Sequence, residues 1–181
     1  MSFSKYSTTL IHGITGSGKT LVYSEIIKEA LRQNLQVLVL LPEIALTKQI
    51  SHRFEEYFGS EVALWHSSVG DKKKKIIWHN ISLNKIKLVL GARSSLFLPF
   101  QNLKLVVIDE EHDSSYKQED GVIYNARDMS ILRASIENFP VLLVSATPSI
   151  ESYYNYKLKK YFYVSIQSRY KNFSLPRTEI I

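Results

Sequence analysis

The stretch TTLIHGITGSGKT, residues 8–20, decides the fold class of this chain. Residues 8–12 form a short β-prone run, residues 13–20 match the pattern G-x-x-x-x-G-K-[ST], and a helical pattern follows from Lys19 to about Gln33. Glycines in such a loop allow positive φ and let backbone N–H groups surround phosphate oxygens at a helix N-terminus. The stretch therefore predicts a strand, a phosphate-binding loop and a helix. The alternative is a glycine-rich turn with a surface lysine.

Apolar runs and helical patterns alternate along the rest of the chain. Strands are expected at residues 36–41, 61–65, 86–91, 103–108 and 141–144, and helices at residues 44–58, 71–83 and 125–138. Strands separated by helices of this length imply βαβ units. The sequence therefore predicts an α/β fold, with a mostly parallel β-sheet and helices on both faces.

The composition excludes several classes of function. The 181 residues include no cysteine, which excludes disulfides, cysteine zinc sites, iron–sulfur clusters and cysteine nucleophiles. No apolar run approaches the ~20 residues that span a bilayer, and residues 1–6 contain no signal-peptide core. We therefore expect a cytoplasmic protein without membrane contacts.

The charge balance favours a polyanionic partner. The chain has 23 Lys and Arg against 17 Asp and Glu, a net charge of +6. Consecutive lysines occur at residues 72–75. We interpret this run as a solvated helix face rather than a DNA patch, because no aromatic residue interleaves with it before Trp78.

Two further motifs follow apolar runs and so fall at the edge of the sheet where open α/β proteins bind ligands. Asp109 and Glu110 end one run; the first carboxylate can hold Mg²⁺ and the second can orient or deprotonate water. Ser145 and Thr147 follow the next run. Alone, the acids could form an ordinary acidic turn and the hydroxyls could cap a strand. With a phosphate-binding loop upstream, they predict a nucleotide site.

The order of these motifs resembles the first motor lobe of superfamily-two helicases. The resemblance narrows to the PriA family of bacterial replication-restart helicases on residues 13–20, 41–47, 65–67, 91–97, 99–100, 109–113, 115–118, 124–128 and 145–148. It implies a RecA-like P-loop domain at residues 1–150 that binds ATP, and a C-terminal extension toward a second lobe at residues 151–181. It also implies a bacterial, cytoplasmic, ATP-dependent DNA helicase that unwinds stalled replication forks and supports primosome assembly in replication restart.

The resemblance implies roles for single residues. The residues expected to bind ATP are Gly13, Thr15, Gly16, Ser17, Gly18, Lys19 and Thr20. Thr20 and Asp109 would hold Mg²⁺, and Lys19, Asp109 and Glu110 would form the catalytic set. The residues expected to couple hydrolysis to lobe movement are Glu111, His112, Ser145 and Thr147.

A DNA path is implied for a further set, which is Thr47, Arg93, Ser94, Tyr116, Lys117 and Tyr124. A helix N-terminus with the Thr47 hydroxyl could hold a phosphate, and Arg93 could donate charge-assisted hydrogen bonds. Tyr116 and Tyr124 could stack on bases, and Lys117 could contact a phosphate. The alternatives are that Arg93 pairs with a local carboxylate and that the tyrosines lie in a mobile surface loop.

The expected partners are single-stranded and forked DNA, with single-strand-binding protein and other primosome components for the full-length protein. The family's N-terminal DNA-binding region, its second lobe with an arginine finger and its cysteine zinc site have no counterpart in this chain. Zinc is therefore expected only in the family's region that is absent here, and we expect the isolated chain to be nearly inactive. Two other interpretations stay open: a P-loop ATPase that does not act on nucleic acid, and a non-catalytic fork-binding module.

Overall fold

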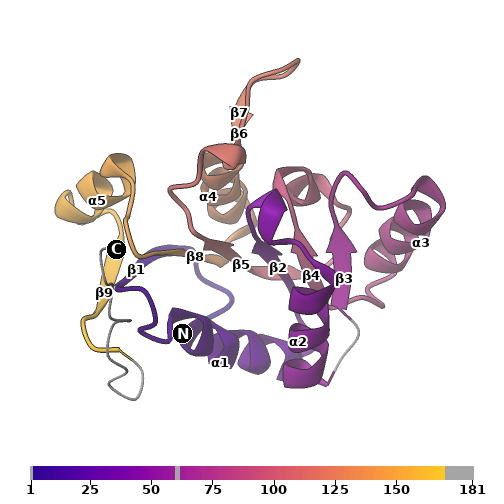
Figure 1. The fold of residues 1–181 in the computed structure, drawn as a ribbon, viewed down its shortest axis with the longest axis horizontal. Coiled ribbons are helices and arrows are strands. Elements are labelled where there is room, and N and C mark those ends of the chain that lie inside the picture. Colours follow the sequence, from indigo (N-terminus) through magenta and orange to yellow (C-terminus); the bar gives the residue numbers. More distant parts are fainter. Residues whose placement is uncertain (1, 60–61, 170–181) are drawn as a thin grey trace, which may run out of the picture.

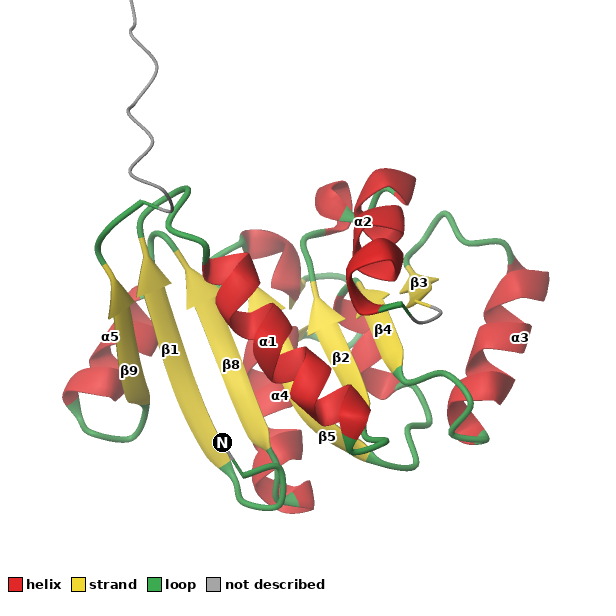
Figure 2. Cartoon of the chain, turned by 90° about the horizontal axis from the view of Figure 1, so that it is seen from below, coloured by secondary structure: helices red, strands yellow, loops and turns green. Residues whose placement is uncertain are grey.

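The computed structural model describes residues 2–59 and 62–169, which form a parallel β-sheet covered by helices (Figures 1 and 2). The sheet has seven strands in the order β3-β4-β2-β5-β8-β1-β9, and every pairing is parallel. The strands are β1 (Ser7–Gly13), β2 (Gln36–Leu40), β3 (Val62–Trp65), β4 (Leu88–Gly91), β5 (Leu103–Asp109), β8 (Pro140–Ser145) and β9 (Phe162–Ile166). The predicted α/β class and parallel sheet are confirmed.

Helices lie on both faces of this sheet. They are α1 (Lys19–Arg32), α2 (Lys48–Phe58), α3 (Asp71–Ser82), α4 (Ala126–Glu137) and α5 (Ile150–Lys157). Single 3-10 turns are η1 (Glu43–Ala45), η2 (Arg93–Phe97) and η3 (Ser114–Tyr116), and a small antiparallel hairpin pairs β6 (Lys117–Gln118) with β7 (Tyr124–Asn125). Helices α1 and α2 contribute to the apolar cluster on one face, and α3 and α4 contribute to the cluster on the other.

The central strand β2 shows why its sequence is a continuous apolar run. Val37 and Val39 belong to the cluster under α1 and α2, whereas Leu38 and Leu40 belong to the cluster under α3 and α4. All four side chains are fully buried, because successive strand residues point to opposite faces and both faces are covered. Each burial stabilises the fold by roughly 1.5–3 kcal/mol.

One predicted helix begins later than expected. The chain forms η1 after Pro42, and α2 begins only at Lys48. The Thr47 hydroxyl accepts a hydrogen bond from the Ile50 N–H (3.3 Å) and so caps the helix at this position. The prediction of a helix from Ile44 is therefore wrong for its first turn. The other predicted strands and helices are found within about two residues of their expected ends, apart from residue 61, which lies outside the described residues.

The chain continues the sheet beyond β8. Helix α5 and strand β9 were not predicted, and β9 pairs in parallel with β1, from Thr9 opposite Phe162 to Gly13 opposite Ile166. The described part of residues 151–181 thus adds an edge strand to the same sheet, while residues 170–181 lie outside the described residues. Across residues 2–59 and 62–169, no helix has the length and apolar character that crossing a membrane requires.

Candidate functional site

The loop between β1 and α1 lies at the edge of the sheet where the strands end (Figure 2). Gly16 (φ 77°) and Gly18 (φ 85°) have left-handed backbone. Gly18 caps α1 without a side-chain bond, so the first N–H groups of the helix have no partner within it. A Cβ on Gly13 would lie 2.5 Å from the Ser17 Oγ, so a larger residue at this position would force the Ser17 side chain to move. The Lys19 ammonium donates to the Gly13 carbonyl oxygen (2.8 Å) and lies within the loop.

The acid pair lies at the end of β5, beside this loop. The Asp109 carboxylate accepts hydrogen bonds from the Tyr23 hydroxyl (2.9 Å) and from the Glu110 N–H (3.0 Å). Burial raises the pKa of Asp109, and the bond from Tyr23 opposes this rise. Burial and the nearby Asp109 charge raise the pKa of Tyr23, so its hydroxyl keeps its proton and remains a donor. The sequence analysis did not single out Tyr23 as a residue of the site. The available signal was its position, one helical turn after the loop.

Glu110 differs from Asp109 in its exposure. Its backbone is left-handed (φ 48°), which non-glycine residues rarely adopt. Its carboxylate is 45% exposed, and the Oε2 atom lies 3.7 Å from the Nδ1 of His112. Together with the loop, both acids line a hollow of about 370 Å³, which is formed by Thr15, Gly16, Ser17, Gly18, Lys19, Thr20, Leu21, Asp109 and Glu110. The structure therefore brings the predicted phosphate-binding and catalytic residues together.

The donor set of this hollow fits a nucleotide with Mg²⁺. The Ser17 Oγ is buried without a hydrogen-bond partner among the described residues, in the loop where phosphate oxygens would supply one. Thr20 and Asp109 lie on the same hollow. Protein sites usually bind Mg²⁺ through one or two side chains, completed by phosphates and water. A ready-made cluster of three ligands is therefore unnecessary, and the described part of the chain contains none.

Three residues of the predicted coupling set are in contact. The His112 Nδ1 lies 2.8 Å from the Ser145 Oγ, and the His112 Nε2 lies 3.4 Å from the Thr147 Oγ1. The Thr147 N–H donates to the Ser145 Oγ (2.9 Å). The end of β5 is thus joined through hydrogen bonds to the end of β8.

The fourth residue of that set, Glu111, lies in a separate buried network. Its side chain is fully buried and accepts bonds from the Ser149 N–H (2.7 Å), the Ser149 hydroxyl (3.0 Å), the Ser152 hydroxyl (2.8 Å) and the Arg127 Nη1 (3.2 Å). Arg127, Ser149 and Ser152 were not predicted as functional residues. Arg127 lies in segment 124–128, which resembles helicases, but the sequence of this segment does not reveal that its guanidinium bonds to Glu111.

The residues predicted to contact DNA lie beside the ends of β2 and β4. The Arg93 Nη1 donates to the carbonyl oxygens of Ser115 (3.2 Å) and Lys117 (2.9 Å), so Arg93 holds the loop before the hairpin. None of the described carboxylates forms an ion pair with Arg93, so the alternative that Arg93 pairs with a local carboxylate is not found. Ser94 and Thr47 are exposed.

Tyr116 does not present a stacking face. It is 1% exposed, and its hydroxyl donates to the carbonyl oxygens of Asp109 (2.6 Å) and Leu40 (3.0 Å). The prediction that its ring is open to DNA bases is therefore wrong, because the ring fills the core beneath the loop. Lys117 is exposed and pairs with Glu119 (3.1 Å). Tyr124 is half-buried, with its ring 5.2 Å from the Phe97 ring.

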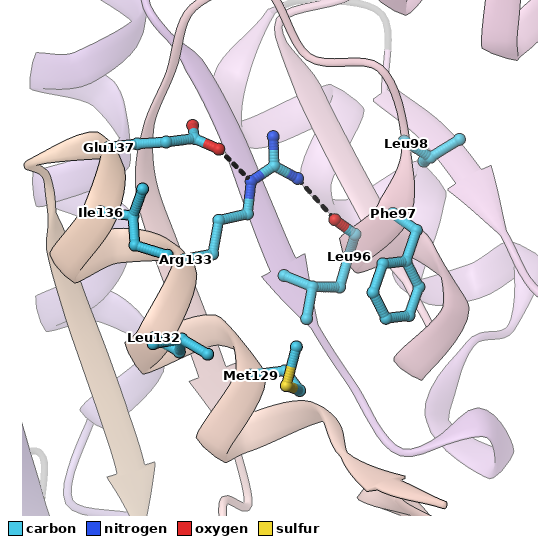
Figure 3. A pocket seen from close by; sticks show the side chains of 8 residues that line it. All are labelled: Leu96, Phe97, Leu98, Met129, Leu132, Arg133, Ile136 and Glu137. Carbon is cyan, nitrogen blue, oxygen red and sulfur yellow. Dashed lines mark hydrogen bonds and ion pairs between the residues drawn. The ribbon is translucent and has the colours of Figure 1, made fainter. Parts of the chain in front are cut away.

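Further hollows lie outside the loop. One, of about 700 Å³, lies between α1 and α2 and adjoins Thr20 and Asp109. Another is a groove of about 390 Å³ between η2 and α4 (Figure 3), where the Arg133 guanidinium bonds to the Glu137 carboxylate and to the Leu96 carbonyl oxygen. Its lining is mostly apolar and it shares no residue with the phosphate-binding loop.

These features define a class of protein. A phosphate-binding loop, an acid pair and a hydroxyl–histidine cluster lie at one edge of a parallel sheet, which is the arrangement of RecA-like nucleotide-binding lobes. Comparison with known proteins agrees. The chain matches the DEAD/DEAH box helicase family over residues 3–155.

Similar proteins extend this result. The chain is 56% identical over 173 residues to the replication restart protein PriA of Rickettsia felis, which covers 96% of this chain and 27% of that protein. It is 41% identical over 177 residues to PriA of Bacillus subtilis, covering 98% and 22%. Among solved structures, RecG bound to a three-way DNA junction has a TM-score of 0.63 at 24% identity, covering 88% of this chain and 20% of RecG. At 24% identity, the similarity to RecG shows a shared fold.

The chain therefore belongs to the DEAD/DEAH box helicase family. The resemblance to the PriA proteins that the sequence predicted is confirmed. The chain spans only about a quarter of the length of these relatives, between 22% and 27%.

Proposed function

We propose that this chain is the ATP-binding motor lobe of a DNA-dependent ATPase, a helicase that unwinds stalled replication forks and supports primosome assembly in replication restart. The observation that carries the proposal is the convergence of Lys19, Asp109 and Glu110 on one hollow at the edge where the strands end. The names of the PriA relatives support the part that concerns replication restart.

The residues of the hollow divide the chemistry among them. The loop N–H groups and Lys19 would bind the phosphates, and Thr20 and Asp109 would hold a magnesium ion. When bound, Mg²⁺ neutralises charge on the phosphate oxygens. Glu110, whose carboxylate is exposed to the hollow, orients the attacking water. The contacts among His112, Ser145 and Thr147 join this chemistry to the end of β8.

DNA contacts are assigned to the ends of β2 and β4. Thr47, at the start of α2, and Ser94, in η2 after β4, are exposed on the same edge as the nucleotide hollow. Arg93 orders the loop that leads to Lys117, and the half-buried Tyr124 completes this set. Single-stranded and forked DNA are the substrates that we propose, with single-strand-binding protein and primosome components as partners in the bacterial cytoplasm. The ATP-binding lobe that we propose extends beyond residue 150, because β9 (Phe162–Ile166) pairs with β1 as a strand of its sheet.

The nucleotide site is tested by Lys19→Ala. The substitution removes the cation from the loop, so we expect most ATP affinity to be lost while the fold is retained, since Lys19 begins a helix at the surface. Isothermal titration calorimetry of the chain with Mg·ATP measures the effect, and Lys28→Ala on the same helix is the control. Equal affinity in wild type and Lys19→Ala would refute the assignment.

The motor function is tested by hydrolysis with and without forked DNA. We expect DNA to stimulate ATP hydrolysis by the full-length protein, and Glu110→Gln to abolish it. Absence of stimulation would favour an ATPase that does not act on nucleic acid, and fork restart by the Glu110→Gln protein would favour a non-catalytic module. We expect the 181-residue chain alone to hydrolyse ATP near background, because arginine fingers supply about 10³–10⁵ in rate where they are present and the resemblance to superfamily-two helicases implies that this arginine belongs to a second lobe.

A further inference from the structure

Both tryptophans of the chain lie on one small surface. The sequence contains two, Trp65 at the end of β3 and Trp78 in α3. With Lys74 and Lys75 they line a shallow hollow of about 220 Å³. We call these four residues the Trp–Lys surface.

The geometry of α3 creates this surface. Trp78 lies four residues after Lys74 and three after Lys75, so the three side chains share one side of the helix. Ile77 and Ile81 face the core, and Trp78 is 50% exposed. The Lys74 ammonium lies 5.9 Å from the centre of the Trp65 ring, a cation–π distance, and donates to the Ser67 carbonyl oxygen (3.3 Å). A cation and two indoles are therefore held together.

The sequence pattern had concealed this arrangement. The sequence favours a solvated helix face for the lysine run at residues 72–75, because no aromatic residue interleaves with the run before Trp78. In the fold, however, β3 brings Trp65 beside Lys74. Aromatic and basic side chains are therefore neighbours in space although they do not alternate in sequence.

The surface continues the edge of the sheet that carries the proposed DNA contacts. Strand β3 is the edge strand next to β4, and Trp65 pairs with Gly91 in their register. The Trp65 Nε1 donates to the Ser94 Oγ (3.2 Å), which fixes the indole beside the residue assigned to DNA. The Trp–Lys surface is therefore a direct extension of that path, on the side away from the nucleotide.

The charges of this region favour an anion. Within the described residues, the ion pairs include none of the lysines at positions 72–75. The acidic groups nearby are Asp71, which is exposed at the start of α3, and Glu43, whose carboxylate accepts a bond from the Ser67 N–H (3.0 Å). Positive charge therefore prevails beside the exposed indole.

We propose that the Trp–Lys surface binds single-stranded DNA, with Lys74 and Lys75 on phosphates and the Trp78 indole stacked on a base. An exposed ring face can stack only on an unpaired base, which favours a single strand over a duplex. The inference rests on the proposed function, because it extends the DNA path of the same lobe beyond Arg93 and Ser94.

Intrinsic fluorescence gives a local test, because the 181-residue chain has tryptophan nowhere else. Oligothymidylate should quench the tryptophan emission of the chain. The Trp65→Phe variant, which keeps Trp78 as the emitter, should show most of the quenching. The Trp78→Ala variant should bind the oligonucleotide about 5- to 150-fold more weakly, the loss that corresponds to one stacked base. Far-UV circular dichroism checks that each variant is folded.

The lysines are tested by salt dependence, with a matched control. Replacing Lys74 and Lys75 by Gln should reduce the slope of log affinity against log salt by roughly 1.4, since each phosphate contact on a single strand contributes about 0.7. Replacing Lys72 and Lys73 by Gln removes the same charge from the same helix. These two lysines lie more than about 100° around the helix axis from Trp78, so the replacement should change the slope less.

The outcomes separate this inference from the proposed function. Fluorescence anisotropy measures binding of fluorescein-labelled DNA independently of the tryptophans. If this DNA binds without quenching the tryptophan emission, and if the two surface variants do not change its affinity, the inference is overturned while the proposed motor function stands. Equal quenching by polyglutamate would overturn it in favour of an acidic protein partner. If the full-length ATPase is not stimulated by DNA, the proposed function itself fails.

Discussion

Removing the Glu111 carboxylate should destabilise the lobe more than almost any other single change to a charged residue. The Glu111 side chain is 0% exposed and that of Arg127 is 10% exposed. Glu111→Ala leaves the Arg127 guanidinium with the largely exposed carboxylates of Asp128 and Glu151. It also removes the acceptor of the Ser149 N–H and of the Ser152 hydroxyl. Breaking a buried ion pair by removing one partner costs about 3–5 kcal/mol.

That cost is large relative to the stability of a typical domain, which is about 5–15 kcal/mol. For a chain of this length, 1 kcal/mol corresponds to roughly 2–4 °C in Tm, so we expect a fall of about 6–20 °C. Urea unfolding followed by far-UV circular dichroism measures the free energy of unfolding directly. The exposed pair of Glu29 and Arg32 supplies the control, and Glu29→Ala should change that free energy by less than about 1 kcal/mol.

A double-mutant cycle isolates the contact itself. If Glu111 and Arg127 stabilise the fold through each other, the double Ala variant should cost less than the sum of the two single variants, by about 0.5–3 kcal/mol. Strict additivity, or a Glu111→Ala cost below about 1 kcal/mol, would refute the reasoning. In the full-length protein, Arg127→Ala should also reduce DNA stimulation of hydrolysis more than the basal rate, because Arg127 begins the helix that follows the β6–β7 hairpin.

Two further predictions follow from buried groups at the end of β5. The fold raises the pKa of the Asp109 carboxyl above its ordinary value of 3.8. The contribution of the protonated carboxyl to stability is therefore fully present below pH 3.8, and it is lost as the pH rises through the pKa of the folded state. Asp109→Asn should therefore be at least as stable as wild type at neutral pH and lose this advantage below about pH 4, in urea midpoints measured across pH. Tyr116→Phe should cost about 0.5–1.5 kcal/mol of unfolding free energy for the lost hydroxyl bonds. An unchanged urea midpoint would show that the Tyr116 hydroxyl bonds do not stabilise the fold.

The apolar runs predicted the central strands because those strands are buried on both faces. In β2 every residue is buried, and after Gln36 no polar residue interrupts the apolar run. Strand β9 escaped prediction because it lies at the edge, where Phe162 and Val164 remain exposed. The start of α2 was misplaced because the apolar spacing continues through Ile44, and the Thr47 cap decides the boundary.

The candidate site was predictable where the chemistry is local in sequence. Residues 13–20 form one loop, and Asp109 and Glu110 follow one strand, so their spacing alone indicates a nucleotide site. Tyr23, Arg127 and Tyr116 act through contacts with residues far along the chain. The hydroxyl of Tyr23 meets a carboxylate 86 residues away, and that of Tyr116 meets a carbonyl oxygen 76 residues away. No local pattern distinguishes such a tyrosine from one that stacks on DNA.

The buried position of Tyr116 gives the loop before the hairpin a structural role at the nucleotide site. Its hydroxyl bonds to the end of β2, at Leu40, and to the end of β5, at Asp109. The first of these strands leads into the turn that ends at Thr47, and the second carries the acid pair. A shift of either strand end must therefore lengthen or break a bond of about 3 Å, beyond which hydrogen bonds weaken steeply. Arg93 fixes the same loop through the carbonyl oxygens of Ser115 and Lys117. If a DNA phosphate drew the Arg93 guanidinium away from these carbonyl oxygens, the loop would be released. Because Tyr116 lies in this loop and bonds to the Asp109 carbonyl oxygen, the release would affect the backbone of Asp109, which is assigned to magnesium.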